Sequence, residues 1–175
     1  MRLSSGGTTI DLAGPTDCSL VTPPERAAIL ARLGPDPLRP DADPSTAIRR
    51  ITRSRAPIGT LLLDQSVLAG VGNVFRAEAL FVLGIHPGRP GRDLDTGDAE
   101  ALWATLRTML RDGVRANRIV TVRPGEVGAR SRSHVPRREA TYVYHRACCL
   151  RCDAPIATLE LANRTCYYCP RCQPA

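Results

Sequence analysis

The chain has 175 residues, enough for one modest core and a small appended module. All 24 of its basic residues are Arg, and with 17 acidic residues the formal net charge is +7. Positions 101–175 hold 13 Arg against 5 acidic residues, whereas positions 1–100 are nearly balanced. This asymmetry favours a polyanionic partner, most often a nucleic acid, although a GC-rich genome could account for the missing Lys. No apolar run approaches the ~20 residues of a membrane span.

The N-terminal half predicts strands followed by helices. Residues 1–20 predict one or two short strands, ended by Gly14-Pro15. Thr22-Pro-Pro-Glu25 is a capping box that begins a helix with an apolar stripe, and Gly34-Pro35 ends that helix. Asp43-Pro44 opens a second helix, and two more are expected at about 57–69 and 74–83.

Between the last two of these helices lies the sequence Gly70-Val-Gly72-Asn73. Two glycines permit a tight turn and the close approach of a polyanion to the backbone. Asn73 is predicted to cap the next helix, where free N–H groups and the helix dipole favour a phosphate. The same residues could equally form only a corner between two helices, and the spacing leaves both interpretations open.

The C-terminal half predicts one long helix, a long loop and a short strand. Apolar residues recur at helical spacing from Asp95 or Thr96 to Val114. Residues 116–140 are rich in Arg, Gly and Ser and predict a loop of the length that is usually functional or disordered. Residues 141–145 predict a short strand.

Two Cys-x-x-Cys pairs stand near the C-terminus, Cys149 with Cys152 and Cys169 with Cys172. Doubled pairs joined by a short hairpin are typical of a structural Zn²⁺ site with four thiolate ligands. Four thiolates leave no open coordination position, so this metal would hold a shape and would not activate water. Two disulfides are the alternative, which the absence of a signal peptide disfavours.

Three further cysteines fall outside this register. Cys148 and Cys166 lie within the zinc segment, and we expect both to stay off the metal, because using Cys166 would leave Cys172 without a partner. Cys18 lies far upstream and is expected to be a small buried apolar residue.

Three segments, in the same order along the chain, resemble the formamidopyrimidine-DNA glycosylase/endonuclease VIII family. The stretch 61–78, followed by Gly84-Ile-His-Pro87, is similar to the helix-two-turn-helix motif of that family. The segment 144–173 is similar to its C-terminal zinc finger, and 32–38 to the junction between its two domains. An Arg five residues before the third zinc Cys points to the endonuclease VIII-like branch.

The resemblance implies a fold that is mainly α, a helical bundle with a helix-two-turn-helix motif plus a C-terminal β-hairpin zinc finger. The resemblance implies three parts. Residues 1–20 would be remnant strands of a missing N-terminal β-sandwich domain. Residues 21–140 would form the helix-two-turn-helix DNA-binding domain, and residues 141–175 the four-cysteine zinc finger.

The resemblance also assigns roles to three residues. Asn73 would bind a phosphate that flanks the lesion, and Arg32 would make a further contact to DNA. Arg164, at the tip of the zinc hairpin, would reach the phosphate beside the damaged nucleotide and assist the second strand-cleaving elimination. Without the flanking motif, Arg164 would be interpreted as a solvated surface charge.

One departure limits what the chain is expected to do. The nucleophile of the family is a proline at the mature N-terminus followed by Glu, with a catalytic Lys further along the first domain. This sequence begins Met1-Arg2-Leu3 and contains no Lys. We therefore expect the chain to bind DNA without glycosylase activity of its own, whether it is a fragment, a mis-assigned start or a genuine truncated product.

The expected partner is double-stranded DNA that contains damaged or abasic sites. We expect a monomer in the cytoplasm, associated with the nucleoid through DNA, and no association with a membrane. Two alternatives belong to other classes, a standalone zinc-finger DNA-binding protein and an RNA-binding protein. The second of these leaves Arg164 and the Cys-Pro-x-Cys-Gln sequence at 169–173 unexplained.

Overall fold

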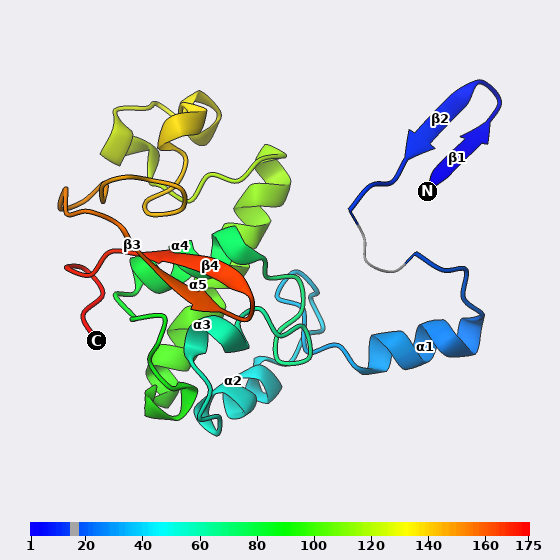
Figure 1. The fold of residues 1–175 in the computed structure, drawn as a ribbon, viewed down its shortest axis with the longest axis horizontal. Coiled ribbons are helices and arrows are strands. Elements are labelled where there is room, and N and C mark those ends of the chain that lie inside the picture. The colour runs from blue at the N-terminus through cyan, green and yellow to red at the C-terminus, as the bar shows by residue number, and fades with distance from the viewer. Residues whose placement is uncertain (15–17) are drawn as a thin grey trace. The chain divides into compact units, whose positions relative to one another are not determined.

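The computed structural model describes residues 1–14 and 18–175 of the chain (Figure 1). Pro15, where the first strands were predicted to end, lies outside the described residues. The chain divides into two compact units, residues 1–32 and residues 33–175.

The first unit begins with an antiparallel hairpin, as the sequence predicts. Strand β1 (Arg2–Ser5) pairs with strand β2 (Thr8–Asp11). All residues of both strands are exposed. Because two strands by themselves enclose no core, Cys18 is also exposed, and the expectation that it is buried is wrong.

Helix α1 (Pro23–Ala31) follows in the same unit and confirms the predicted capping box. The carboxylate of Glu25 accepts hydrogen bonds from the backbone N–H of Thr22 at 2.7 Å and from its hydroxyl at 2.8 Å. No residue of α1 is buried, so its predicted apolar stripe is exposed.

The second unit holds the remaining helices and a second hairpin. Its elements are α2 (Pro44–Thr52), α3 (Ile58–Leu61), α4 (Asn73–Val82), the 3-10 turn η1 (Gly91–Asp93), α5 (Thr96–Ala116), the 3-10 turns η2 (Pro124–Val127), η3 (Arg132–His134) and η4 (Arg137–Glu139), and the strands β3 (Ala157–Leu161) and β4 (Arg164–Tyr168). None of the described helices combines the length and apolar character that crossing a membrane requires.

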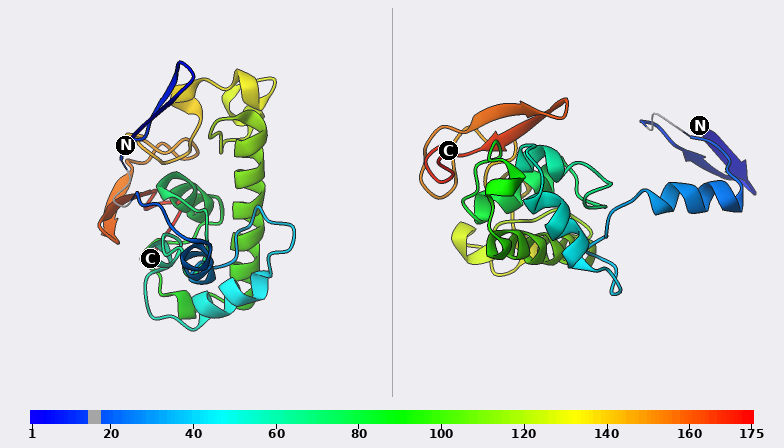
Figure 2. Two further views of the ribbon diagram at one scale, coloured as in Figure 1. Left: turned by 90° about the vertical axis from the view of Figure 1, so that its right-hand side faces the viewer. Right: turned by 90° about the horizontal axis from the view of Figure 1, so that it is seen from below.

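Helix α4 is the centre of this unit. Both views of Figure 2 place α4 between the long helix α5 and the β3–β4 hairpin. Its residues from position 76 to position 81 are all buried, so both faces of the helix pack against other parts of the fold. A helix held in this way on both sides gives its first turn a fixed position.

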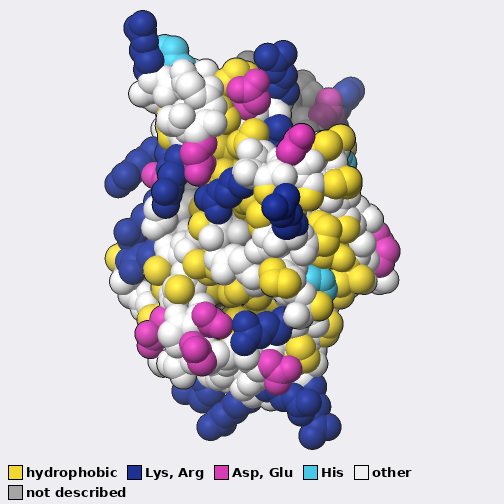
Figure 3. Space-filling view, turned by 90° about the vertical axis from the view of Figure 1, so that its left-hand side faces the viewer, with side chains coloured by type: hydrophobic (Ala, Val, Ile, Leu, Met, Phe, Trp, Pro, Cys, Tyr) yellow, Lys and Arg dark blue, Asp and Glu magenta, His cyan; other side chains and the backbone are white. Residues whose placement is uncertain are grey.

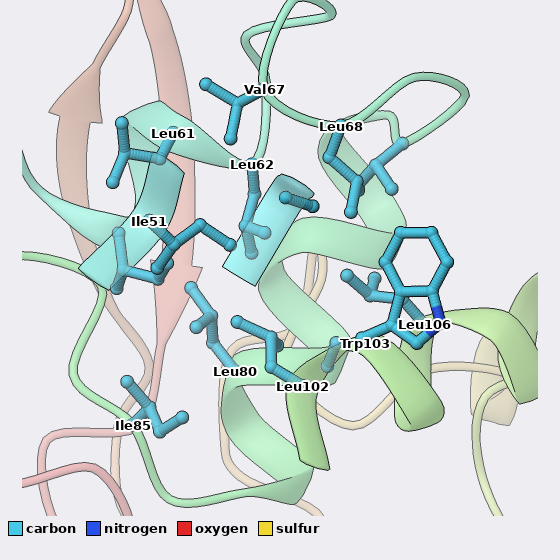
Figure 4. Close-up of a cluster of buried hydrophobic side chains, with 14 of the residues drawn as sticks. Ile51, Leu61, Leu62, Val67, Leu68, Leu80, Ile85, Leu102, Trp103 and Leu106 are labelled. Carbon is cyan, nitrogen blue, oxygen red and sulfur yellow. The ribbon is translucent and has the colours of Figure 1, made fainter. Parts of the chain in front are cut away.

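The two faces of α4 pack into two apolar cores. Leu80 joins the first core, which is formed with α2, α3 and α5 and includes Leu62, Leu102 and Leu106 (Figure 4). Phe81 joins the second core, which combines the segment 120–143 with the zinc-finger segment. The helical core and the C-terminal segment are thus joined through one helix.

The helix predicted at 57–69 is much shorter in the structure. Helix α3 ends at Leu61, and the chain continues in turns to Gly72. The cause is the side chain of Asp64, which accepts hydrogen bonds from the backbone N–H of Ser66 at 2.8 Å and from its hydroxyl at 2.6 Å. An Asp that bonds to its own backbone two residues on favours a turn over a helix.

The prediction of a strand at 141–145 is also wrong, because these residues form bends and turns. The backbone N–H groups of Tyr142, Val143 and Tyr144 donate to the carboxylate of Glu78 and not to a neighbouring strand. The loop predicted at 116–140 is confirmed, apart from its three 3-10 turns and the first residue, Ala116, which ends α5.

Candidate functional site

The side chain of Gln65 makes three hydrogen bonds within the turns between α3 and α4. Its Nε2 donates to the carbonyl oxygens of Leu63 at 3.2 Å and Val71 at 3.1 Å. Its Oε1 accepts from the backbone N–H of Gly70 at 2.8 Å. Gly70 has φ 85°, a conformation that a residue with a Cβ adopts only under strain. Gln65 and Gly70 together direct the chain into the start of α4.

The start of α4 leaves backbone donors unused. The N–H groups of Asn73, Val74 and Phe75 have no acceptor among the described residues, and Arg76 donates to the carbonyl of Gly72. A Cβ at Gly72 would meet nothing within 4 Å. An open backbone in front of three free N–H groups at a helix start is a favourable place for an anion.

Asn73 is the first helical residue, and the predicted cap position belongs to Gly72. The side chain of Asn73 is engaged elsewhere: its Nδ2 donates to the carbonyl of Thr165 at 3.0 Å, and its Oδ1 accepts from Arg76. Because an amide NH₂ group carries two hydrogens, one of them stays available for a ligand. The prediction that Asn73 caps α4 is therefore corrected.

The β3–β4 hairpin carries Arg164 at its tip, as the family resemblance implies. Leu161 pairs with Arg164, so the turn has two residues, Ala162 and Asn163. Both have positive φ, 54° and 56°, the conformation of a type I′ turn. Arg164 is exposed, and no carboxylate among the described residues lies within 4.0 Å of its guanidinium.

The hairpin tip and the turn before α4 face a common hollow with a volume of ≈ 660 Å³. Its lining comes from α3, from the turn region and from the tip of the hairpin, and consists of Thr60, Leu63, Asp64, Gln65, Gly70, Val71, Gly72, Ala162 and Arg164. The structure therefore brings the glycine turn and Arg164 together, although about ninety residues separate them in the sequence.

The carboxylate of Glu78 ties α4 to the segment that leads into the zinc finger. Besides the three N–H groups of residues 142–144, the hydroxyl of Thr121 donates to it. The pKa of Glu78 is raised, because the effect of burial exceeds the lowering by these four hydrogen bonds. Since every partner is a donor, the geometry suits an ionised carboxylate, which anchors the second core to α4.

The four predicted zinc ligands are brought together. Their Sγ atoms all lie within 4.8 Å of one another. Three pairs measure 3.9 Å for Cys149 and Cys172, 3.5 Å for Cys152 and Cys169, and 3.5 Å for Cys152 and Cys172. Zn–S bonds of about 2.3 Å give a tetrahedral edge of about 3.8 Å, so the cluster fits Zn²⁺. The four cysteines form a closed structural zinc site.

The other cysteines of this segment are off the metal, as expected. Cys148 is exposed, and Cys166 is a buried residue of strand β4. Gln173 is buried as well, and its Nε2 donates to the carbonyl of Ile85 at 2.8 Å while its Oε1 accepts from the N–H of Cys169 at 3.0 Å. Gln173 therefore fixes the second Cys pair against the end of α4, a role that the sequence did not reveal.

The arginines are spread widely over the surface. Figure 3 shows one face of the molecule, on which Arg side chains lie scattered among apolar and neutral groups and do not form a single block. Several bind the protein itself, such as Arg132, which pairs with Asp112 at 2.8 Å. Arg32, predicted to contact DNA, follows α1 in the first unit and is exposed.

A helix start and a zinc-held hairpin tip that converge on one hollow define a zinc-finger protein of the nucleic-acid-binding type. Two family models match the chain. The formamidopyrimidine-DNA glycosylase H2TH domain matches residues 33–123, and the zinc finger found in FPG and IleRS matches residues 149–175. The chain belongs to the formamidopyrimidine-DNA glycosylase/endonuclease VIII family. This membership does not favour the two alternatives considered from the sequence, a standalone zinc-finger DNA-binding protein and an RNA-binding protein.

Curated relatives agree with this membership. The chain is 47% identical to endonuclease 8 1 of Mycobacterium tuberculosis, over 99% of this chain and 65% of that protein. It is 38% identical to the formamidopyrimidine-DNA glycosylase of Thermomicrobium roseum, over 82% of this chain and 50% of that protein. The chain therefore spans between half and two thirds of the length of these relatives.

Solved structures share the fold. The MutM (FPG) protein of Thermus thermophilus is similar with a TM-score of 0.67 and 33% identity, over 85% of this chain and 56% of that chain. Wild-type Lactococcus lactis Fpg, in complex with DNA that contains N7-benzyl-Fapy-dG, has a TM-score of 0.68 and 25% identity, over 86% of this chain and 55% of that chain.

Proposed function

We propose that this chain is the DNA-binding portion of a base-excision-repair DNA glycosylase and abasic-site lyase that acts on oxidised bases. The observation that carries the proposal is the hollow that Gly72, the cap residue of α4, and Arg164 both line, with the free N–H groups of residues 73–75 following Gly72 in the chain. The endonuclease 8 relative favours the endonuclease VIII-like branch. The helix-two-turn-helix motif is assigned to α3, the turns that follow it and α4, within a helical domain at 21–140.

The proposed ligand of this hollow is the phosphate backbone beside a damaged or abasic nucleotide. The free hydrogen on Nδ2 of Asn73 and the N–H groups behind it donate to one phosphate oxygen. Arg164 binds a second phosphate, because a guanidinium matches a phosphate with two parallel hydrogen bonds. Arg32 is proposed to add a further contact. The zinc site holds the hairpin whose tip presents Arg164.

Base removal by the 175-residue chain itself is not expected. The chain contains no Lys, and its primary amine, on Met1, donates to the carbonyl of Leu12 at 2.8 Å. Placing a nucleophile correctly contributes about 7–11 kcal/mol in such reactions, and Met1 is an exposed residue at the head of a two-strand hairpin whose residues are all exposed. Incubation with damaged DNA and borohydride should therefore leave no trapped adduct, and a stoichiometric adduct would contradict this part of the proposal.

The binding proposal is tested by the salt dependence of affinity for a duplex with one abasic site. Each phosphate bound contributes about 0.9 to the slope of log affinity against log salt, so two or three phosphates give a slope of about 2–3. Gly72→Ala should weaken binding, because its Cβ meets no protein atom within 4 Å and can clash only with a ligand. Gly97→Ala at the start of α5 is the matched control and should bind as the parent does.

An affinity that does not change with salt, or a Gly72→Ala variant that binds as tightly as Gly97→Ala, would contradict the proposal. We further propose that the chain binds DNA as a monomer and that its cellular place is the nucleoid. Analytical ultracentrifugation with and without the duplex tests the first of these statements.

A further inference from the structure

The most unusual side chain of the second unit is that of Arg76 in α4. It is completely buried, with 0% of its surface exposed. Among the described residues, no carboxylate lies within 4.0 Å of its guanidinium, and its Nε has no hydrogen-bond partner. Buried charges are normally paired, and an apolar side chain of similar volume would cost less to bury here. The stability of the fold therefore does not explain an Arg at this position.

Its hydrogen bonds go instead to helix α3, to the start of α4 and to the β3–β4 hairpin. Nη1 donates to the carbonyl oxygens of Gly59 at 3.1 Å and Leu161 at 3.3 Å. Nη2 donates to Oδ1 of Asn73 and to the carbonyl oxygen of Arg164 at 3.4 Å. One guanidinium thus joins the start of α4 to both residues that flank the hairpin turn.

We propose that Arg76 is a positioning residue for phosphate binding, which sets the orientation of Asn73 and the place of Arg164 and adds a buried positive charge behind them. The inference rests on the proposed function. Because guanidinium groups only donate, Arg76 requires the oxygen of the Asn73 amide to face it. The NH₂ group of Asn73 must then face Thr165 and the ligand side.

The electrostatic part has a separate observation behind it. The pKa of Arg76 is lowered, chiefly by burial and also by the positive charge of Arg164, although Cys166 and Glu160 act in the opposite direction. Two guanidinium groups that repel each other across a hairpin turn are relieved by an anion bound near both. A DNA phosphate supplies the counter-charge that Arg76 lacks in the free protein.

The test compares Arg76→Met with Arg92→Met in the 175-residue chain. Met fills the volume of Arg without its charge or donors, and Arg92 is an exposed arginine of η1 that controls for the loss of one charge. We expect Arg76→Met to weaken binding to the abasic duplex about tenfold and to lower the salt slope by about 1, while zinc content stays at one per chain. Arg92→Met should change affinity less than twofold.

A double-mutant cycle separates positioning from a general structural effect. If Arg76 acts through Asn73, then Arg76→Met should lose most of its effect on affinity in an Asn73→Ala background. Effects of the two substitutions that simply multiply would overturn the inference. If Arg76→Met does not fold, Arg76→Lys replaces it, because Lys keeps the charge and some of the donors. This variant should bind the duplex with reduced affinity. Full affinity in Arg76→Lys, with the NMR signals of the Asn73 amide unchanged, would overturn the inference.

A measurement without DNA keeps the inference apart from the proposed function. In ¹⁵N NMR spectra of the free chain, the side-chain NH₂ of Asn73 should be shifted and slowed in exchange with solvent, because it is held against the carbonyl of Thr165. In Arg76→Met this signature should be lost. Its persistence would overturn the inference alone, whereas a parent chain that does not bind DNA would contradict the proposed function alone.

Discussion

Removing the carboxylate of Glu78 should separate the zinc-finger segment from the helical core. In Glu78→Ala, the backbone N–H groups of Tyr142, Val143 and Tyr144 lose their acceptor in a buried site. An unsatisfied buried donor costs about 1–3 kcal/mol, so three of them cost on the order of 3–9 kcal/mol. Because the net stability of a domain is about 5–15 kcal/mol, this loss is a large part of the whole.

Thr121→Val is the matched control for this experiment. It removes one donor from the same carboxylate, leaves the three N–H bonds in place, and should cost about 1 kcal/mol. Urea unfolding can be followed through Trp103, the single tryptophan of the chain, which is buried in the first core. Zinc content measured on the same samples shows whether the zinc finger keeps its metal.

The expected order of stability is the parent chain, then Thr121→Val, then Glu78→Ala, with earlier zinc loss in the last. A Glu78→Ala variant whose free energy of unfolding lies within about 1 kcal/mol of the parent would refute this account of how the two cores are joined.

Three further predictions concern the zinc site, the hairpin turn and the turn after α3. Cys169→Ser combined with Cys172→Ser should abolish zinc binding in metal analysis, while Cys148→Ser should retain one zinc per chain; the opposite result would reassign the ligands. Ala162→Gly should stabilise the hairpin by about 0.5–1 kcal/mol in thermal unfolding, because Ala162 has φ 54°, and an unchanged midpoint would contradict the strain. Hydrogen bonds from the side chain and backbone of Ser66 lower the pKa of Asp64 from its ordinary value of 3.8. The stability lost in Asp64→Ala should therefore be constant above pH 3.8 and shrink as the pH falls through the lowered pKa. A loss of stability that grows with acidity would contradict this prediction.

Local chemistry was visible in the sequence. The capping box at 22–25, the proline that opens α2 and the apolar periodicity of α5 each depend on residues a few positions apart. The zinc ligands could be identified for the same reason, because metal geometry fixes the spacing within each Cys pair and the hairpin brings the pairs together. The place of Arg164 at the hairpin tip was implied by the resemblance to the family, and the strand register agrees with it.

What the sequence could not show depends on contacts across the fold. Glu78 replaces the neighbouring strand that residues 141–145 were expected to have, and no local pattern indicates a partner more than sixty residues away. Arg76 looks like a solvated charge in a helical sequence, and its burial follows only from the hairpin packed over α4. Gln65 lies in the motif that the sequence shares with the family, but its three hydrogen bonds within the turn could be identified only from the structure. Asp64 is a partial exception, since an Asp two residues before Ser is a known turn former.

The most direct test of the central claim is to map where DNA touches this chain. A short duplex with one abasic site is titrated into the ¹⁵N-labelled, zinc-loaded protein at low salt, and backbone amide shifts are followed. We expect the largest changes at residues 72–75 and 162–165, because Gly72, Ala162 and Arg164 line the hollow and the free N–H groups of residues 73–75 follow Gly72 directly. Changes confined to α2 and η1, with residues 72–75 and 162–165 unaffected, would contradict the claim that this hollow is the DNA-binding site.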